Sequence, residues 1–275
     1  MRNNSRGRSG KRSPRAVPSA KPSSLLYNRR ADGEAWTEHL RLAALASLTH
    51  ELRTPLQVLH GNLDRLKHEA PDNLPARWHQ MLERMNVDVC EFTRIVENIM
   101  VFVLDDPSKE VRAKVPTREL IDDVMPLIEA VNHDKQLALQ VDLDEAPPVV
   151  HAPYRPLRLI LANLGVNAVR FTDRGSVKIA IRQAGKLDRP EVAFEVADTG
   201  RGFGAELRDG LFAPFAQLAS SQHPGLRSLG LDLSVVKRCV ASLDGNLEAH
   251  SVPGQGSRFV VRFPVPAHGV TSQIS

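Results

Sequence analysis

Two apolar stripes with helical spacing, separated by a proline-containing break, constrain the fold of this chain more than any other feature. The first stripe consists of leucines three or four positions apart, namely Leu45, Leu48, Leu52, Leu56, Leu59, Leu63 and Leu66. Residues 69–75 (EAPDNLP) then interrupt the helical pattern with two prolines and an Asp-Asn pair. The second stripe alternates between spacings of three and four and contains Leu82, Met85, Val89, Phe92, Val96, Ile99 and Val103. Because such a heptad seam packs helix against helix, the sequence predicts an antiparallel helical hairpin.

A hairpin of this kind cannot bury both of its apolar stripes by itself. Two helices leave much of each stripe in contact with water, and a second copy of the hairpin would cover them. The sequence therefore predicts a homodimer held together by a four-helix bundle.

After residues 105–107 the pattern changes to a mixture of helices and strands. Helical periodicity predicts helices at 117–132, 153–170 and 230–243. Apolar alternation predicts strands at 111–115, 137–143, 176–183, 191–197, 246–251 and 257–264. Between 199 and 229 lies a glycine-rich stretch without periodicity, and so long an irregular segment is rare in a compact domain unless it is a functional loop. We expect this segment to be a lid.

The first 30 residues differ in composition from the rest of the chain. They contain nine basic and no acidic side chains, although the whole chain has a net charge of only +4. They are also rich in Ser, Pro and Asn and have almost no apolar residues before Leu25, so residues 1–35 are expected to form a disordered tail. Contact of this tail with nucleic acid or anionic lipid is the alternative.

No membrane span is expected, because no apolar run approaches about 18 residues. No secretory signal is expected either, because the basic first stretch has no apolar h-region with a cleavage site behind it. The two cysteines, Cys90 and Cys239, are far apart in the chain and lie in apolar-periodic segments. This placement predicts buried free thiols in a reducing compartment, and hence a cytoplasmic protein.

His50 is the candidate nucleophile of the first helix. At 100° per residue it lies about 200° from Leu48 and about 160° from Leu52, so it points away from the apolar stripe. The neighbouring Glu51 could hold the Nδ1 proton and leave Nε2 free to attack. Thr54, one turn further on, could bind a water or a phosphoryl oxygen at the same place. A solvated His-Glu pair by itself does not indicate a function. The surrounding residues determine whether this pair is a candidate site.

The surrounding string, His50-Glu51-Leu52-Arg53-Thr54-Pro55, resembles the H-box of two-component sensor histidine kinases. Further motifs follow in the order of that family. Residues 163–172 resemble the N-box, 198–202 the G1 box, 211–215 the F-box, 229–231 part of the G2 box, and 254–259 the last glycine motif. The resemblance covers roughly residues 40 to 266.

The resemblance implies an α+β chain with two domains. A dimerisation and histidine phosphotransfer hairpin would occupy 36–106, and a GHKL-type α/β-sandwich ATP-binding domain would occupy 110–266, with a short C-terminal tail at 267–275. It also implies autophosphorylation of His50 from Mg²⁺-ATP, assisted by Glu51 and Thr54, and transfer to an aspartate of a response regulator receiver domain. Thr54 would position water for the reverse, phosphatase reaction. The stimulus would come from an upstream sensor protein, the tail or a part outside this chain.

The same resemblance assigns the nucleotide site residue by residue. Asn167 would supply a Mg²⁺ ligand, and Arg170 would hold the phosphates. Asp198 would accept a hydrogen bond from the exocyclic amine of adenine. The full set of implied ATP-binding residues is Asn163, Asn167, Arg170, Asp198, Gly200, Gly202, Phe212, Phe215, Gly230, Leu231, Gly254 and Gly256. Taken without the resemblance, the stripe of Asn163, Asn167 and Arg170 would be a solvated helix face.

Two positions depart from the family pattern and leave alternatives open. Ser228 stands where a second G2-box glycine is expected, and Asp232 replaces a small residue and adds negative charge near the polyphosphate. A degenerate, non-catalytic protein that docks a response regulator is therefore one alternative. A GHKL hydrolase of the gyrase or chaperone type is another, but those enzymes resemble one another in having a catalytic Glu where this chain has Asn163.

Overall fold

The structure is a computed structural model. It describes residues 52, 54–63, 65–66, 69, 71, 75–103, 107–186, 188–207, 210–215 and 230–266. The predicted tails at 1–35 and 267–275, the residues His50, Glu51 and Ser228, and most of the predicted lid lie outside the described residues.

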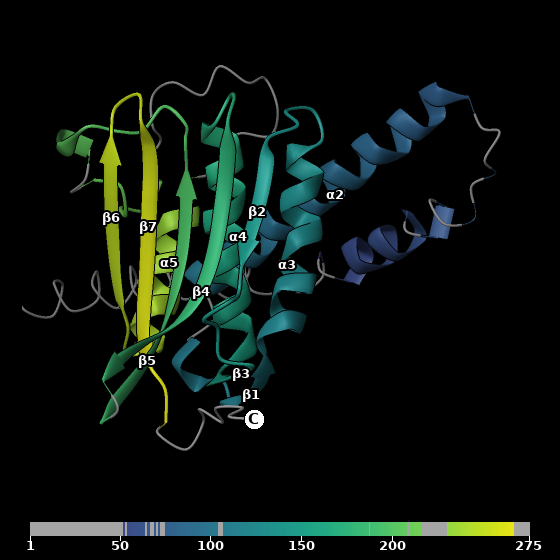
Figure 1. Cartoon of the computed structure of the whole chain (residues 1–275). Coiled ribbons are helices and arrows are strands. Elements are labelled where there is room, and N and C mark those ends of the chain that lie inside the picture. Colours follow the sequence, from purple (N-terminus) through teal and green to yellow (C-terminus); the bar gives the residue numbers. More distant parts are fainter. Residues whose placement is uncertain are drawn as a thin grey trace, which may run out of the picture. The chain divides into compact units, whose positions relative to one another are not determined.

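The predicted hairpin corresponds to two helical segments. Residues 54–63 are helical, and the long helix α2 runs over Ala76–Val103 after the proline-containing break (Figure 1). Leu56 and Leu63 of the first segment are buried, whereas Leu52, Leu59 and Leu66 remain 40–54% exposed. Several large apolar side chains of α2 are also exposed, namely Trp78, Met81, Met85 and Phe92. The single chain thus leaves part of each stripe open, since Met85 and Phe92 belong to the second stripe, and Trp78 and Met81 add exposed apolar surface beside it.

The remaining chain contains a five-stranded mixed sheet of order β2-β4-β5-β7-β6. Its strands are β2 (Ala138–Asp142), β4 (Ser176–Lys186), β5 (Arg189–Asp198), β6 (Asn246–Val252) and β7 (Gly256–Pro264). Only β2 and β4 pair in parallel; the other neighbours are antiparallel. A separate antiparallel pair joins β1 (Ala113–Pro116) to β3 (Val149–Ala152).

Three helices cover one face of this sheet (Figure 1). They are α3 (Thr117–Asn132), α4 (Tyr154–Phe171) and α5 (Asp232–Ser242). The described residues also include two short 3-10 turns, η1 (Pro107–Lys109) and η2 (Ala205–Leu207). The core between helices and sheet includes Ile160, Leu164 and Phe194, each with an exposed fraction of 1% or less. The α+β class and the helix-on-sheet layering agree with the sequence-based expectation.

Most of the predicted elements are present with boundaries shifted by a few residues, and the helix predicted at 117–132 has the predicted bounds. Strand β3 was not predicted. Its four residues follow two consecutive prolines and pair only with the equally short β1, so they carry too little alternation to be recognised. Cys90 and Cys239 are buried free thiols, as expected. Among the described residues, none of the helices is both long and apolar enough to span a membrane.

Candidate functional site

The N-box side chains of α4 do not form a solvated face. Asn163 is fully buried and Asn167 is 8% exposed, while Arg170 near the end of the helix is partly buried. The reading of this stripe as a solvated face is therefore wrong for both asparagines. Buried amides need hydrogen-bond partners, so the neighbours of these side chains are informative.

Asp198 is the last residue of β5 and is largely buried. The backbone N–H of Gly200 donates to its Oδ1 at 2.8 Å, and the hydroxyl of Thr172 lies 3.5 Å from the same atom. Burial raises the pKa of this carboxyl, although the hydrogen bonds from Gly200, Ser257 and Thr172 oppose the increase. A buried carboxylate of this kind favours a ligand that brings its own N–H donors.

The glycines around Asp198 are required by the packing of the loop itself. A Cβ on Gly200 would lie 2.2 Å from the carbonyl oxygen of Phe171, at the end of α4. Gly202 has a φ of +62°, and a Cβ there would lie 2.2 Å from the carbonyl oxygen of Val252. The expected reason for these glycines, close approach to a nucleotide, is thus joined by a second one, the close approach of the loop to α4 and β6.

Lys135 holds the carboxyl end of α4 in place. Its Nζ donates to the carbonyl oxygens of Val169, Arg170 and Thr172 at 3.0, 2.7 and 2.9 Å. These carbonyls lie in the last turn of α4 and at its C-cap, where few backbone N–H donors are available, and Val169 accepts in addition only a 3.4 Å hydrogen bond from the N–H of Thr172. A lysine in this position therefore satisfies them and also interacts favourably with the helix dipole. Lys135 thereby fixes the segment that carries Arg170 and Thr172, a role that no motif in the sequence indicates.

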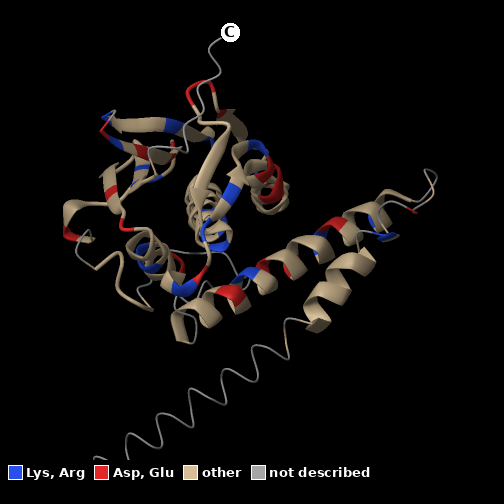
Figure 2. Ribbon diagram, turned by 90° about the horizontal axis from the view of Figure 1, so that it is seen from below, with Lys and Arg blue, Asp and Glu red and all other residues tan. Residues whose placement is uncertain are grey.

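The N-box helix α4 contacts α2 through Asn163 and Arg170. Acidic and basic residues are interspersed along α2 (Figure 2), and two of them, Glu91 and Arg94, are buried in its second half. Arg94 is 3% exposed and Asn98 is 1% exposed. Such polar groups are rarely buried without partners, and here the partners come from α4 and α5.

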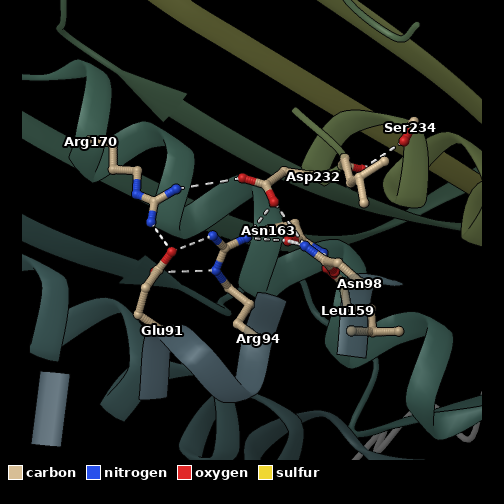
Figure 3. Close-up of polar contacts among 9 residues, drawn as sticks. Glu91, Arg94, Asn98, Leu159, Asn163, Arg170, Asp232 and Ser234 are labelled. Carbon is tan, nitrogen blue, oxygen red and sulfur yellow. Dashed lines mark hydrogen bonds and ion pairs between the residues drawn. The ribbon is translucent and has the colours of Figure 1, made fainter. Parts of the chain in front are cut away.

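Arg94 and Asn98 both contact the N-box and the start of α5 (Figure 3). The Nη1 of Arg94 donates to Oδ1 of Asn163 at 2.7 Å and to Oδ1 of Asp232 at 2.6 Å. The amide nitrogen of Asn98 donates to the same two oxygens, each at 2.8 Å. The amide nitrogen of Asn163 in turn donates to Oδ1 of Asn98 at 3.0 Å. Asn163 and Asp232 are therefore held by one face of α2.

Glu91 connects the same face of α2 to Arg170. The Nη2 of Arg94 donates to Oε1 of Glu91 at 2.9 Å, and Arg170 forms an ion pair with the same carboxylate (Figure 3). Burial by itself would raise the pKa of Glu91, but the charges of Arg94 and Arg170 outweigh it and hold the pKa below its usual range. The charges of Asp232 and Glu91 likewise outweigh the effect of burial on Arg94 and raise its pKa. Both groups are therefore charged at neutral pH.

Other predicted site residues lie at different places around this part of the fold. Thr54 is exposed on the first helical segment. Gly230 and Gly254 have positive φ values of 68° and 76°, as left-handed glycines do. The remaining implied residues are Phe212, which is partly buried; Phe215, which is 62% exposed; Leu231, which is buried; and Gly256, whose Cβ would lie 1.9 Å from the carbonyl oxygen of Asp198.

Comparison with protein families matches the two parts of the chain separately. Residues 40–106 match the His Kinase A (phospho-acceptor) domain. Residues 153–267 match the histidine kinase-, DNA gyrase B- and HSP90-like ATPase family. The chain thus combines a phosphoacceptor domain with an ATPase-type catalytic domain.

Individual relatives lead to the same class. The chain is 29% identical over 228 residues to the sensor histidine kinase RcsC of Escherichia coli K12, covering 80% of this chain and 23% of RcsC. It is 31% identical over 222 residues to the sensor histidine kinase AruS of Pseudomonas aeruginosa PAO1, covering 78% and 22%. This chain therefore spans under a quarter of the length of these two relatives.

A solved structure of full-length ShkA in complex with AMPPNP resembles the fold, with a TM-score of 0.56 and 27% identity over 81% of this chain and 46% of that chain. The order of the two domains and these likenesses place the chain in the two-component sensor histidine kinase family. The ATPase-family domain and the AMPPNP-bound neighbour support ATP binding.

Proposed function

We propose that this chain is the catalytic core of a sensor histidine kinase that phosphorylates His50 from Mg²⁺-ATP and passes the phosphoryl group to an aspartate of a separate response regulator. The observation that carries the proposal is the pairing of a His-Glu-x-x-Thr-Pro string in the hairpin with a buried, loop-bound Asp198 in the ATPase-type domain. Neither part would be sufficient alone.

Asp198 is the group best suited to recognise adenine. Its carboxylate lies at the end of β5 with its donors on the protein side, and a nucleobase amine would supply a further donor. The glycine loop around it is held by backbone contacts, including the Arg201 N–H, which donates to the carbonyl oxygen of Phe171 at 3.2 Å. The acceptor is therefore preorganised for a planar base.

The triphosphate would lie toward the carboxyl half of α4. The amide oxygen of Asn167 is a hard oxygen ligand of the kind that Mg²⁺ prefers, and the guanidinium of Arg170 suits phosphate oxygens. When bound, Mg²⁺ would neutralise charge on the phosphates. The side chains of the protein would orient the γ-phosphate and exclude water.

At His50, Nε2 would form a bond to the γ-phosphorus while the bond between that phosphorus and the bridging oxygen breaks and ADP leaves. Glu51 would keep the Nδ1 proton in place, which fixes the tautomer with a free Nε2. The phosphohistidine would then donate its phosphoryl group to a receiver aspartate. Thr54 would place the water that removes the phosphoryl group from the regulator in the reverse reaction.

The exposed apolar residues of the hairpin support a homodimer as the working form. Met81, Met85 and Phe92 lie along α2, and Leu59 and Leu66 lie on the preceding helix. A second copy would bury these side chains in a four-helix bundle. An upstream sensor protein is a further expected partner, and the two free thiols suit a reducing, cytoplasmic location.

The substitution His50→Gln tests the proposal. It should abolish acid-labile, base-stable phosphorylation from radiolabelled ATP while nucleotide binding persists. His79→Gln, at an exposed position of α2, is the matched control and should be labelled like the parent chain. A label that persists in His50→Gln would contradict the assignment and direct attention to His60. Transfer to a panel of receiver domains then identifies the regulator.

A further inference from the structure

The contacts of α2 occupy Asn163, which the family resemblance places in the ATP site, and Arg170, which the proposed function assigns to the phosphates. Asn163 accepts hydrogen bonds from Arg94 and Asn98, and Arg170 forms an ion pair with Glu91. While the guanidinium of Arg170 is paired with the carboxylate of Glu91, it cannot bind a phosphate in the same geometry. The conformation described here is therefore one in which α2 takes the place of part of the ligand.

Asp232 adds a buried carboxylate to this arrangement. It is the first residue of α5, it is 5% exposed, and it replaces the small residue of the family pattern. A carboxylate at this position would repel a polyphosphate that approaches the amino end of α5. In the structure its charge is compensated by Arg94, which reaches it from another helix at 2.6 Å.

The cluster is balanced in charge but incompletely hydrogen-bonded. It holds two arginines, Arg94 and Arg170, and two carboxylates, Glu91 and Asp232. The Nη1 of Arg170 and the Oδ2 of Asp232 are buried, lie 3.6 Å apart and have no hydrogen-bond partner. An unsatisfied buried guanidinium nitrogen raises the free energy of this state. Arg170 can therefore exchange its present partners for phosphate oxygens at a reduced cost.

We propose that Arg94 is a positioning residue that latches α2 onto the ATP-binding domain, so that latch closure and nucleotide binding exclude each other. The inference rests on the proposed function, because the nucleotide is the competing ligand. Closing the latch pairs Arg94 with Asp232 and Arg170 with Glu91. Binding of the triphosphate requires Arg170, and the catalytic domain then leaves α2.

Thermodynamic linkage turns this exclusion into a measurable quantity. A nucleotide that binds only the open state has an apparent dissociation constant equal to its intrinsic value divided by the open fraction. Because Arg94 lies on α2 and outside the nucleotide site, its removal weakens only the closed state. The apparent affinity should consequently rise. A residue with a merely structural role would lower the affinity when removed, so the sign distinguishes the two.

The experiment is calorimetric titration of the full chain with AMPPNP and Mg²⁺. Arg94→Met should tighten binding on the order of tenfold, which corresponds to about 1.4 kcal/mol. Arg94→Lys retains the charge but cannot form all the contacts, and should give an intermediate value. Arg84→Met, at an exposed position ten residues earlier on the same helix, is the matched control and should bind like the parent. If Arg94→Met does not fold, Asn98→Leu removes contacts to the same two oxygens and should act in the same direction.

The outcomes separate the latch from the proposed function. Equal or weaker nucleotide binding by folded Arg94→Met or Asn98→Leu would overturn the latch, whatever happens at His50. Tighter binding without phosphate on His50 would support the latch and contradict the kinase activity. Absence of nucleotide binding in the parent and in both variants would overturn both.

Discussion

Lys135 offers a prediction that can be worked out from its contacts. Replacing it with Met keeps an unbranched side chain of similar length but removes three charge-assisted hydrogen bonds to the end of α4. Lys135 is also 17% exposed in its side chain, so water can replace only some of these donors. We therefore expect Lys135→Met to destabilise the catalytic domain and to disturb the nucleotide site next to it.

The magnitude follows from what is lost and what is regained. A hydrogen bond to a charged group contributes about 1.5–3 kcal/mol, and a cation at a helix C-terminus contributes about 0.3–1 kcal/mol. Three such bonds from one ammonium group are not additive, because the same desolvated charge makes all of them. The methionine also avoids the cost of burying an ammonium group. A net loss of about 2 kcal/mol in the free energy of unfolding is the result.

Urea denaturation followed by circular dichroism measures this loss, and Lys237→Met on the exposed side of α5 serves as the control. The control should change the free energy of unfolding by less than about 0.5 kcal/mol. Nucleotide affinity should fall in Lys135→Met as well, since Thr172 and the carbonyl oxygen of Phe171 support Asp198 and its loop. A stability equal to that of the control would refute the reasoning that these three carbonyls depend on Lys135.

Two further predictions concern the nucleotide pocket and the hairpin. Because the pKa of Asp198 is raised, its carboxylate takes up a proton at a higher pH than an ordinary aspartate, and ATP affinity should decline on acidification before the pH reaches the ordinary value of 3.8. The variant Asp198→Asn should not bind ATP at any pH. Titration with a fluorescent nucleotide measures both effects. The same raised pKa means that ionised Asp198 costs stability, so Asp198→Asn should be at least as stable as the parent at neutral pH. Phe92→Glu, at a 36% exposed position of the α2 seam, should leave the chain folded but monomeric by light scattering, since it places an unpaired charge in the expected helix–helix interface; a stable dimer of this variant would contradict the four-helix bundle.

The fold was predictable where one element carries its own signal. The helix at Thr117–Asn132 combines a proline directly before it with a regular apolar face, and its bounds agree with those predicted. Helix α2 was predictable as well, because it carries a long periodic stripe and begins at Ala76, directly after the proline-containing segment. Strand β3 was missed because a four-residue strand depends on its partner β1, which is more than 30 residues away in the chain.

The site was predictable only in the residues that form motifs. The contacts that bury Asn163 come from Arg94 and Asn98, which are 69 and 65 positions away and lie outside the heptad seam. Helical periodicity assigns such polar residues to solvent, because it cannot represent a neighbour from another domain. The partner of Asp232 was hidden for the same reason, although its charge marked it as a departure.

The two edge strands of the five-stranded sheet bear on how the protein assembles. The outer strand β6 presents Glu248 and His250, and Glu248 is also paired with Arg262 on β7. The opposite edge, β2, is only five residues long and ends in Asp142, which is paired with Lys178 at 2.8 Å and Arg182 at 2.9 Å. A foreign strand that added to either edge would have to desolvate these ion pairs, so the sheet is protected against edge-to-edge aggregation. Two catalytic domains held close together in a dimer should therefore not pair through the edges of their sheets. Contacts between copies of the chain are expected to come from the helices.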